Sequence, residues 1–130
     1  MRFLFFFLLT GLLACAQDAP TTDSTTDEAA IYERLDTPTF LAQLQVAPNA
    51  QLLDVRTPGE YAHGAVENAT LINIQDENFV ENVQQVFKTD QPLYVYCQAG
   101  GRSKRAAQQL QAAGFTEIYE LRDGYRSISR

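Results

Sequence analysis

Histidine, cysteine and positive charge are scarce in this sequence of 130 residues, and tryptophan is absent. The one histidine, His63, excludes a zinc site built from several histidines, and a Ser-His-Asp hydrolase would have to depend on it alone. Two cysteines are too few for a disulfide-dense scaffold. Ten basic against sixteen acidic residues give a net charge of -6 and a pI near 4.6, which argues against a nucleic-acid partner.

The composition is otherwise that of a globular chain, with 45% hydrophobic and 20% charged residues, and the length suits one domain. Residues 15–30 do not fit such a domain. Their central stretch, from Gln17 to Glu28, has four acids, no base and no aromatic or large aliphatic side chain. Because this segment cannot bury a core, we expect residues 15–30 to form a flexible acidic tether and residues 31–130 to form the domain.

The first fourteen residues are typical of an export signal. Arg2 precedes an apolar run from Phe3 to Ala14, which is the pattern of a signal peptide. The run is too short to span a bilayer as a helix, which takes about 20 residues. It ends in Leu12-Leu13-Ala14-Cys15, which resembles the lipobox of bacterial lipoproteins. The resemblance implies cleavage before Cys15, lipidation of Cys15 and a periplasmic or membrane-attached place in the cell envelope. The alternative is an ordinary signal peptide that is cut near Cys15.

Residues 31–130 alternate between short apolar runs and segments with helical spacing. The runs predict five strands, at 31–35, 52–55, 70–74, 93–96 and 117–121. Helices are expected between them, at 36–44, 58–61, 79–87 and 106–113, with a last short helix at 125–128. Strands that alternate with helices favour an α/β fold, a doubly wound, mostly parallel sheet with helices on both faces.

The segment 97–103 links the strand 93–96 to the next helix and carries the most chemistry. Gly100 and Gly101 allow the backbone to curl with positive φ, so that several N–H groups can turn toward an anion. The N-terminus of the following helix adds its positive dipole end. In such a field Cys97 is favoured as a thiolate, which is the nucleophilic form. The alternative is a small cysteine buried in the core.

Charged residues surround this loop and follow another predicted strand. Positive charge near the loop comes from Arg102, Lys104 and Arg105, and this charge would attract an anionic substrate. The alternative is that they are ordinary basic side chains, solvated on the surface of the helix. Asp54 and Arg56 end the strand at 52–55. In sheets of this class, ligands bind outside the carboxyl ends of the strands. We therefore expect the loop 97–103 and the pair of Asp54 and Arg56 to lie at the ligand-binding edge of the sheet.

Two segments together resemble a single-domain rhodanese. They are Leu52-Leu53-Asp54-Val55-Arg56 followed by Glu60-Tyr61, and Cys97-x-x-Gly100-x-Arg102-Ser103. The stretch 121–125 also resembles the family's last strand and turn. The resemblance covers residues 31–129, which is nearly the whole predicted domain.

The resemblance implies a five-stranded sheet and sulfur transfer through a persulfide. Cys97 would attack the sulfane sulfur of a small anionic donor, thiosulfate or polysulfide, and a thiol or cyanide would then accept that sulfur. Arg102 would face the loop and help to bind anions, while Asp54 and Arg56 would brace the loop. No metal or organic cofactor is required. The thiolate and the persulfide would be stabilised by the backbone N–H groups of Gln98, Ala99, Gly100, Gly101, Arg102 and Ser103.

Some positions depart from the family pattern, and other functions stay open. The usual Gly-His-Ile-x-Gly-Ala stretch appears as residues 64–69, and His63 precedes the glycine, so His63 is given no role. Cys97 and Arg102 enclose four residues, whereas the related phosphatases enclose five. The shorter loop suits a sulfur better than a tetrahedral phosphate or arsenate. A cysteine-dependent phosphatase or arsenate reductase therefore ranks below a non-catalytic binding or regulatory module as the alternative function.

Overall fold

The five apolar runs pair into one parallel sheet. The computed structural model describes residues 29–130. Its strands are β1 (Ile31–Leu35), β2 (Gln51–Asp54), β3 (Thr70–Leu71), β4 (Leu93–Tyr96) and β5 (Glu117–Leu121). Their order across the sheet is β1-β5-β4-β2-β3, and each of these pairings is parallel. The doubly wound α/β fold with five strands is therefore confirmed.

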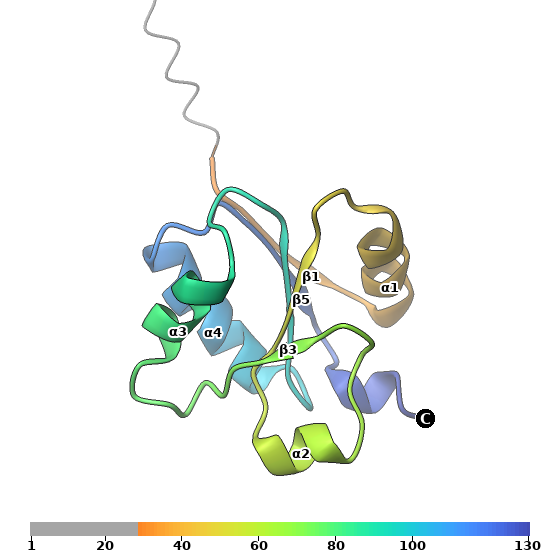
Figure 1. Ribbon diagram of the computed structural model, residues 1–130. Coiled ribbons are helices and arrows are strands. Elements are labelled where there is room, and N and C mark those ends of the chain that lie inside the picture. Colours follow the sequence, from red (N-terminus) through yellow and green to blue (C-terminus); the bar gives the residue numbers. More distant parts are fainter. Residues whose placement is uncertain (1–28) are drawn as a thin grey trace, which may run out of the picture.

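Helices cover both faces of this sheet (Figure 1). On one face lie α3 (Phe79–Val86) and α4 (Gly101–Ala112), and on the other lie α1 (Thr37–Val46) and the 3-10 helix η1 (Tyr125–Ser127). The short helix α2 (Pro58–Ala62) follows β2 at the carboxyl edge of the sheet. The helix α1 begins where the sequence predicts, because Asp36 accepts a hydrogen bond from the Thr39 N–H at 2.9 Å.

Alternation along the strands divides the apolar side chains between two core clusters. In β2, Leu53 belongs to the cluster under α3 and α4, together with Val83 and Leu110. Its neighbour Leu52 belongs to the cluster under α1, together with Phe40. All four residues of β4 are buried, as expected for the central strand of a parallel sheet that is covered on both faces.

Two elements differ in detail from the periodicity of the sequence. The sequence predicts a strand at 70–74, and the β3 ladder pairs Thr70 and Leu71 with β2. Beyond the ladder, the N–H groups of Ile72 and Ile74 still donate to the carbonyl oxygens of Asp54 and Val55 at 2.9 and 3.2 Å. On α3, Val83 is fully buried, whereas Val86 shares its helical spacing and is 56% exposed. The helix ends at Val86, and the chain turns so that the Phe87 side chain is buried instead.

The predictions for the start of the chain concern residues that the structure does not describe. The signal peptide at 1–14, the lipid site at Cys15 and nearly all of the tether at 15–30 lie outside residues 29–130. Within the described residues, no helix is long and apolar enough to cross a membrane. Export and lipidation therefore stay predictions.

Candidate active site

The loop after β4 places Cys97 at the carboxyl edge of the sheet, directly before α4. Cys97 is buried, whereas Ala99 and Gly101 are exposed. Gly100 has a φ of 92°, and a Cβ built on it would lie 2.0 Å from the carbonyl oxygen of Arg122. Because no side chain fits there, glycine is required for the loop to curl around the cysteine sulfur.

The sulfur of Cys97 is enclosed and hydrogen-bonded. The residue is 1% exposed, the Gly100 N–H donates to Sγ at 3.1 Å, and the Ser103 Oγ lies 3.5 Å from Sγ. Burial by itself would raise the pKa of the thiol, but hydrogen bonds from Ser103, Ala99 and Gly100 outweigh it and lower the pKa. The site therefore favours the thiolate.

The turn after β5 holds the backbone of the cysteine loop. The Tyr125 N–H donates to the Cys97 carbonyl oxygen at 2.8 Å, and the Arg126 N–H donates to the Gln98 carbonyl oxygen at 3.2 Å. Gly124 approaches so closely that a Cβ there would lie 2.4 Å from the Gln98 carbonyl oxygen. The shape of the loop thus depends on the residues that begin η1, which are distant in sequence.

Asp54 and Arg56 form a buried ion pair that reaches the cysteine loop. Arg56 Nη2 lies 2.7 Å from Asp54 Oδ2, and the two side chains are 1% and 0% exposed. Arg56 also donates to the side-chain oxygen of Gln98 at 3.0 Å and to the Gly64 carbonyl oxygen at 2.7 Å. Its guanidinium carbon lies 4.3 Å from the centre of the Tyr125 ring. Arg56 therefore links β2, the loop and η1.

Arg102 lies at the start of α4 and is paired with Glu60 of α2. Its two terminal nitrogens donate to the two carboxylate oxygens of Glu60 at 2.7 and 2.6 Å. The hydrogen bonds from Arg102 and from Thr57 outweigh burial and lower the pKa of Glu60 to about 2. The capping box of Thr57 and Glu60 can be read from the sequence. The ion pair joins residues 42 positions apart and cannot be read from the sequence, so no role is predicted there for Glu60.

A buried carboxylate behind the loop is a second residue that the sequence analysis missed. The Ser103 Oγ donates to Glu120 Oε1 at 2.8 Å, and Glu120 is fully buried in β5. Arg34 of β1 supplies the counter-charge at 2.7 Å. The available signal was an acidic residue between Tyr119 and Leu121 in a run that otherwise reads as a buried strand.

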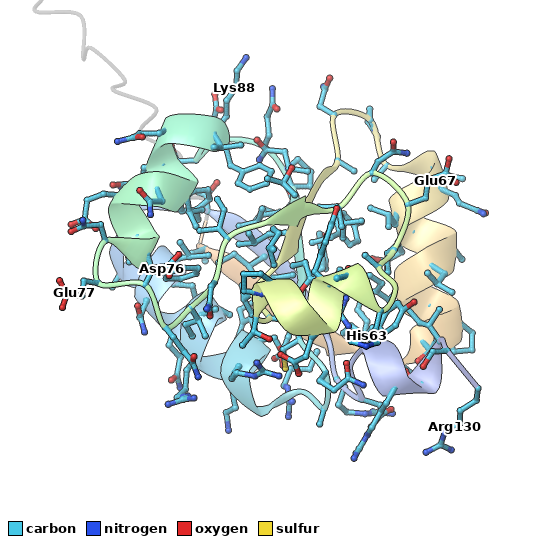
Figure 2. The ribbon with its side chains drawn as sticks, turned by 60° about the horizontal axis from the view of Figure 1, so that its bottom comes forward. His63, Glu67, Asp76, Glu77, Lys88 and Arg130 are labelled. Atoms are coloured by element: carbon cyan, nitrogen blue, oxygen red, sulfur yellow. The ribbon has the colours of Figure 1, made fainter. Side chains whose placement is uncertain are left out.

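A cleft of about 430 Å³ opens beside the loop. Its volume falls in the range of small-molecule sites, roughly 300–1,000 Å³. The cleft is lined by Arg56, Glu60, His63, Gln98, Tyr125 and Ser129. Figure 2 shows His63 at the carboxyl end of α2.

Within residues 29–130, no group of three His, Cys, Asp or Glu side chains could hold a metal ion.

Not every basic residue near the loop contributes to the cleft. Lys104 and Arg105 are exposed on α4, as expected for solvated helix residues. The structure brings together Cys97, the loop backbone, Ser103 and the Asp54–Arg56 pair, and it adds Glu60 and Glu120 to them. Chemically, this is a buried thiol whose pKa is lowered, in a loop whose Gln98 lines a cleft, and the nearby arginines are already paired with acids.

The folded part of the chain is similar to known proteins. The model of the rhodanese-like domain family matches residues 37–130. The chain is 42% identical over 77 residues to the uncharacterized protein YqhL of Bacillus subtilis, with 59% of each protein covered. It is 33% identical over 85 residues to the thiosulfate sulfurtransferase GlpE of Shewanella oneidensis, covering 65% of this chain and 81% of that one.

A solved structure gives a similar result. The human single-domain sulfurtransferase TSTD1 superposes with a TM-score of 0.60 at 25% identity, covering 74% of this chain and 94% of that one. The aligned part of the chain spans only 59% of the length of YqhL. The likeness therefore concerns the folded domain.

Proposed function

The chain belongs to the rhodanese-like family, and on that premise we propose that it is a sulfurtransferase that carries sulfur on Cys97 as a persulfide. The observation that supports this most is the position of the Cys97 sulfur. It lies between the Gly100 N–H and the Ser103 hydroxyl at the start of α4, where its pKa is lowered. A relative at 33% identity is named a thiosulfate sulfurtransferase.

The proposed transfer takes two steps of nucleophilic catalysis on Cys97. The thiolate attacks the sulfane sulfur of the donor. With thiosulfate, the donor's S–S bond breaks, sulfite leaves with the electron pair, and Cys97 keeps the sulfur as a persulfide. A thiolate or cyanide then attacks the outer sulfur, the persulfide bond breaks, and Cys97 leaves as a thiolate. The Gly100 N–H and the N-terminus of α4 stabilise negative charge at Cys97 in both states.

Arg102 supplies positive potential to an anionic donor, and Glu60 limits it. Because Glu60 occupies both terminal nitrogens of Arg102, a donor anion has to share the guanidinium with that carboxylate. The hydrogen bond with Glu60 raises the pKa of Arg102 most, against the effect of burial, and an ionised Cys97 raises it further. Arg102 is therefore close enough to the sulfur to respond to its charge. Asp54 and Arg56 brace the loop through Gln98.

The formation of thiocyanate from thiosulfate and cyanide tests this proposal. The wild-type protein should form thiocyanate, and Cys97→Ser should reduce the rate to background, because a serine hydroxyl is not ionised at neutral pH. Cys15→Ser removes the other cysteine and should leave the rate unchanged. Transfer that survives in Cys97→Ser would contradict the proposal. A folded wild type that uses neither thiosulfate nor polysulfide would favour a binding module, and hydrolysis of an aryl phosphate would favour a phosphatase.

The proposed location rests on the first fifteen residues. Their pattern supports export by residues 1–14 and a lipid anchor on Cys15 in the cell envelope. Inhibition of lipoprotein signal peptidase should accumulate a precursor of lower mobility on a gel. Unchanged mobility would contradict lipidation.

A further inference from the structure

Glu120 is a fully buried carboxylate that the transfer chemistry does not itself use. It accepts hydrogen bonds at Oε2 from the Tyr32 hydroxyl at 2.5 Å and from Arg34 Nε at 2.7 Å. At Oε1 it accepts from Arg34 Nη2 at 3.2 Å and from the Ser103 hydroxyl at 2.8 Å. Burying a charge costs several kcal/mol unless it is paired, and here Arg34 pairs it. One of its four donors is thus the hydroxyl that faces Cys97.

The Ser103 hydroxyl is shared between the Glu120 carboxylate and a sulfur that becomes an anion when Cys97 is deprotonated. A hydroxyl has one proton to donate. In the resting arrangement that proton goes to Glu120, and the Ser103 oxygen faces the Cys97 sulfur at 3.5 Å as an acceptor for the thiol proton. Once Cys97 is a thiolate, the same oxygen has no proton to accept, and the sulfur needs a donor.

We propose that Glu120 is a positioning residue that acts on the Cys97 nucleophile through Ser103. While Cys97 is a thiol, the Ser103 hydroxyl donates its hydrogen bond to Glu120. When Cys97 is a thiolate, the hydroxyl donates to the sulfur instead. The hydroxyl only rotates about its C–O bond. The proton that leaves Cys97 passes to solvent, and Ser103 and Glu120 exchange none. The inference rests on the proposed function only in taking Cys97 as the nucleophile.

Glu120 can give up the hydrogen bond from the Ser103 hydroxyl because it keeps other donors. When the Ser103 hydroxyl turns away, the Tyr32 hydroxyl and two nitrogens of Arg34 still donate to the carboxylate. The thiolate has backbone donors in the loop, from Gly100 at 3.1 Å and from Ala99 and Ser103, and it gains the hydroxyl as one more. Both acceptors are then anions, and a hydrogen bond to an anion is roughly twice as strong as a neutral one. A change at either acceptor therefore shifts the hydroxyl between them.

Arg102 and Arg56 stay paired when Glu120 is changed, whereas Arg34 loses its carboxylate and keeps its contact with the Gly100 carbonyl oxygen at 3.3 Å. Arg102 from α4 is held by Glu60, and Arg56 from β2 is held by Asp54. Lys104 and Arg105 on α4 are exposed, so solvent screens them. Arg122 pairs with Asp123 at the surface, where Asp123 also acts on Arg34. Of the acids around the loop, Glu120 is the one joined to the sulfur through a single hydroxyl.

The pH dependence of Cys97 alkylation by iodoacetamide tests the proposal without any sulfur donor. Glu120→Gln should lower the midpoint of the curve of alkylation rate against pH by about one pH unit. Alkylation at a pH well below that midpoint should then become about tenfold faster. Tyr32→Phe removes one competing donor, so Glu120 holds Ser103 more firmly and the midpoint should rise. General disruption of the site would move both variants in one direction. Shifts of the same sign, or no shift in Glu120→Gln, would overturn the proposal.

A double-mutant cycle shows whether Ser103 transmits the effect. Ser103→Ala should raise the midpoint, because the thiolate loses its donor. Adding Glu120→Gln to Ser103→Ala should then produce only a small part of the shift that it produces in the wild type. If the full shift persists without the hydroxyl, Glu120 acts by charge alone and the proposal fails. Thiocyanate formation by the wild type tests the proposed function separately, so the two failures can be told apart.

Discussion

Three arginine side chains that contact or belong to the cysteine loop are each paired with a carboxylate. Pairing with Arg102 keeps Glu60 ionised, since the pKa of Glu60 is lowered to about 2 from the ordinary 4.5. A carboxyl group whose pKa is depressed on folding stabilises the fold above its unfolded pKa. That contribution is lost as the pH falls from about 4.5 toward 2. At neutral pH the pair is intact, and the cation offered to a donor is partly neutralised. The three pairs are Arg34–Glu120, Arg56–Asp54 and Arg102–Glu60.

Variants of this pair should change selectivity for the charge of the donor. Arg102→Ala should lower kcat/KM for thiosulfate about tenfold, since a hydrogen bond to a charged group is lost, and should affect a neutral dialkyl trisulfide less. Glu60→Gln should raise kcat/KM for thiosulfate, because it frees the guanidinium while glutamine still completes the capping box of α2. Initial rates with both donors measure the ratio. Equal losses for both donors in Arg102→Ala would point to a structural role in the loop.

The elements that shape the site meet at one edge of the sheet. The cysteine loop between β4 and α4 is held by backbone hydrogen bonds from η1 and by the Arg56 side chain from β2. Close contacts at Gly100 and Gly124 leave no room for a side chain. Because residues from β2 and η1 hold the loop, its geometry depends on how the whole sheet is packed as well as on its own residues.

Helix α3 offers a matched pair of substitutions that tests this packing. Val83 is fully buried in the core cluster under α3 and α4, and Val86 is 56% exposed one turn later. Val83→Ala removes two buried methyl-sized groups and should cost about 2 kcal/mol of unfolding free energy. Val86→Ala should change it by less than about 0.5 kcal/mol. Urea unfolding measures both, and equal costs would contradict the described orientation of α3.

What the sequence predicts well is local. Apolar runs and helical spacing predict every strand and helix, because alternation and amphipathic periodicity reflect burial on one or two faces. The short ladder of β3 and the exposure of Val86 depend on how neighbouring elements pack against them, which no single segment encodes. The same holds at the site. The cysteine loop is recognisable from its own residues, whereas the partners Glu60 and Glu120 are brought to it only by folding.

At the scale of the whole molecule, a doubly wound sheet places a cysteine thiolate at its carboxyl edge beside a cleft. The protein carries a net charge of -6, yet the groups around the sulfur are balanced pairs and inward N–H groups. The charged side chains next to the sulfur therefore nearly cancel one another. This arrangement suits a reaction in which negative charge passes from the Cys97 sulfur to the outer sulfur of a persulfide and back within the same loop.

The intact mass of the purified protein shows whether Cys97 forms a persulfide. The mass should increase by one sulfur atom after thiosulfate or polysulfide, return to its first value after cyanide with release of thiocyanate, and stay constant in Cys97→Ser. A folded wild type whose thiol can be alkylated but whose mass does not change with either donor would contradict the account.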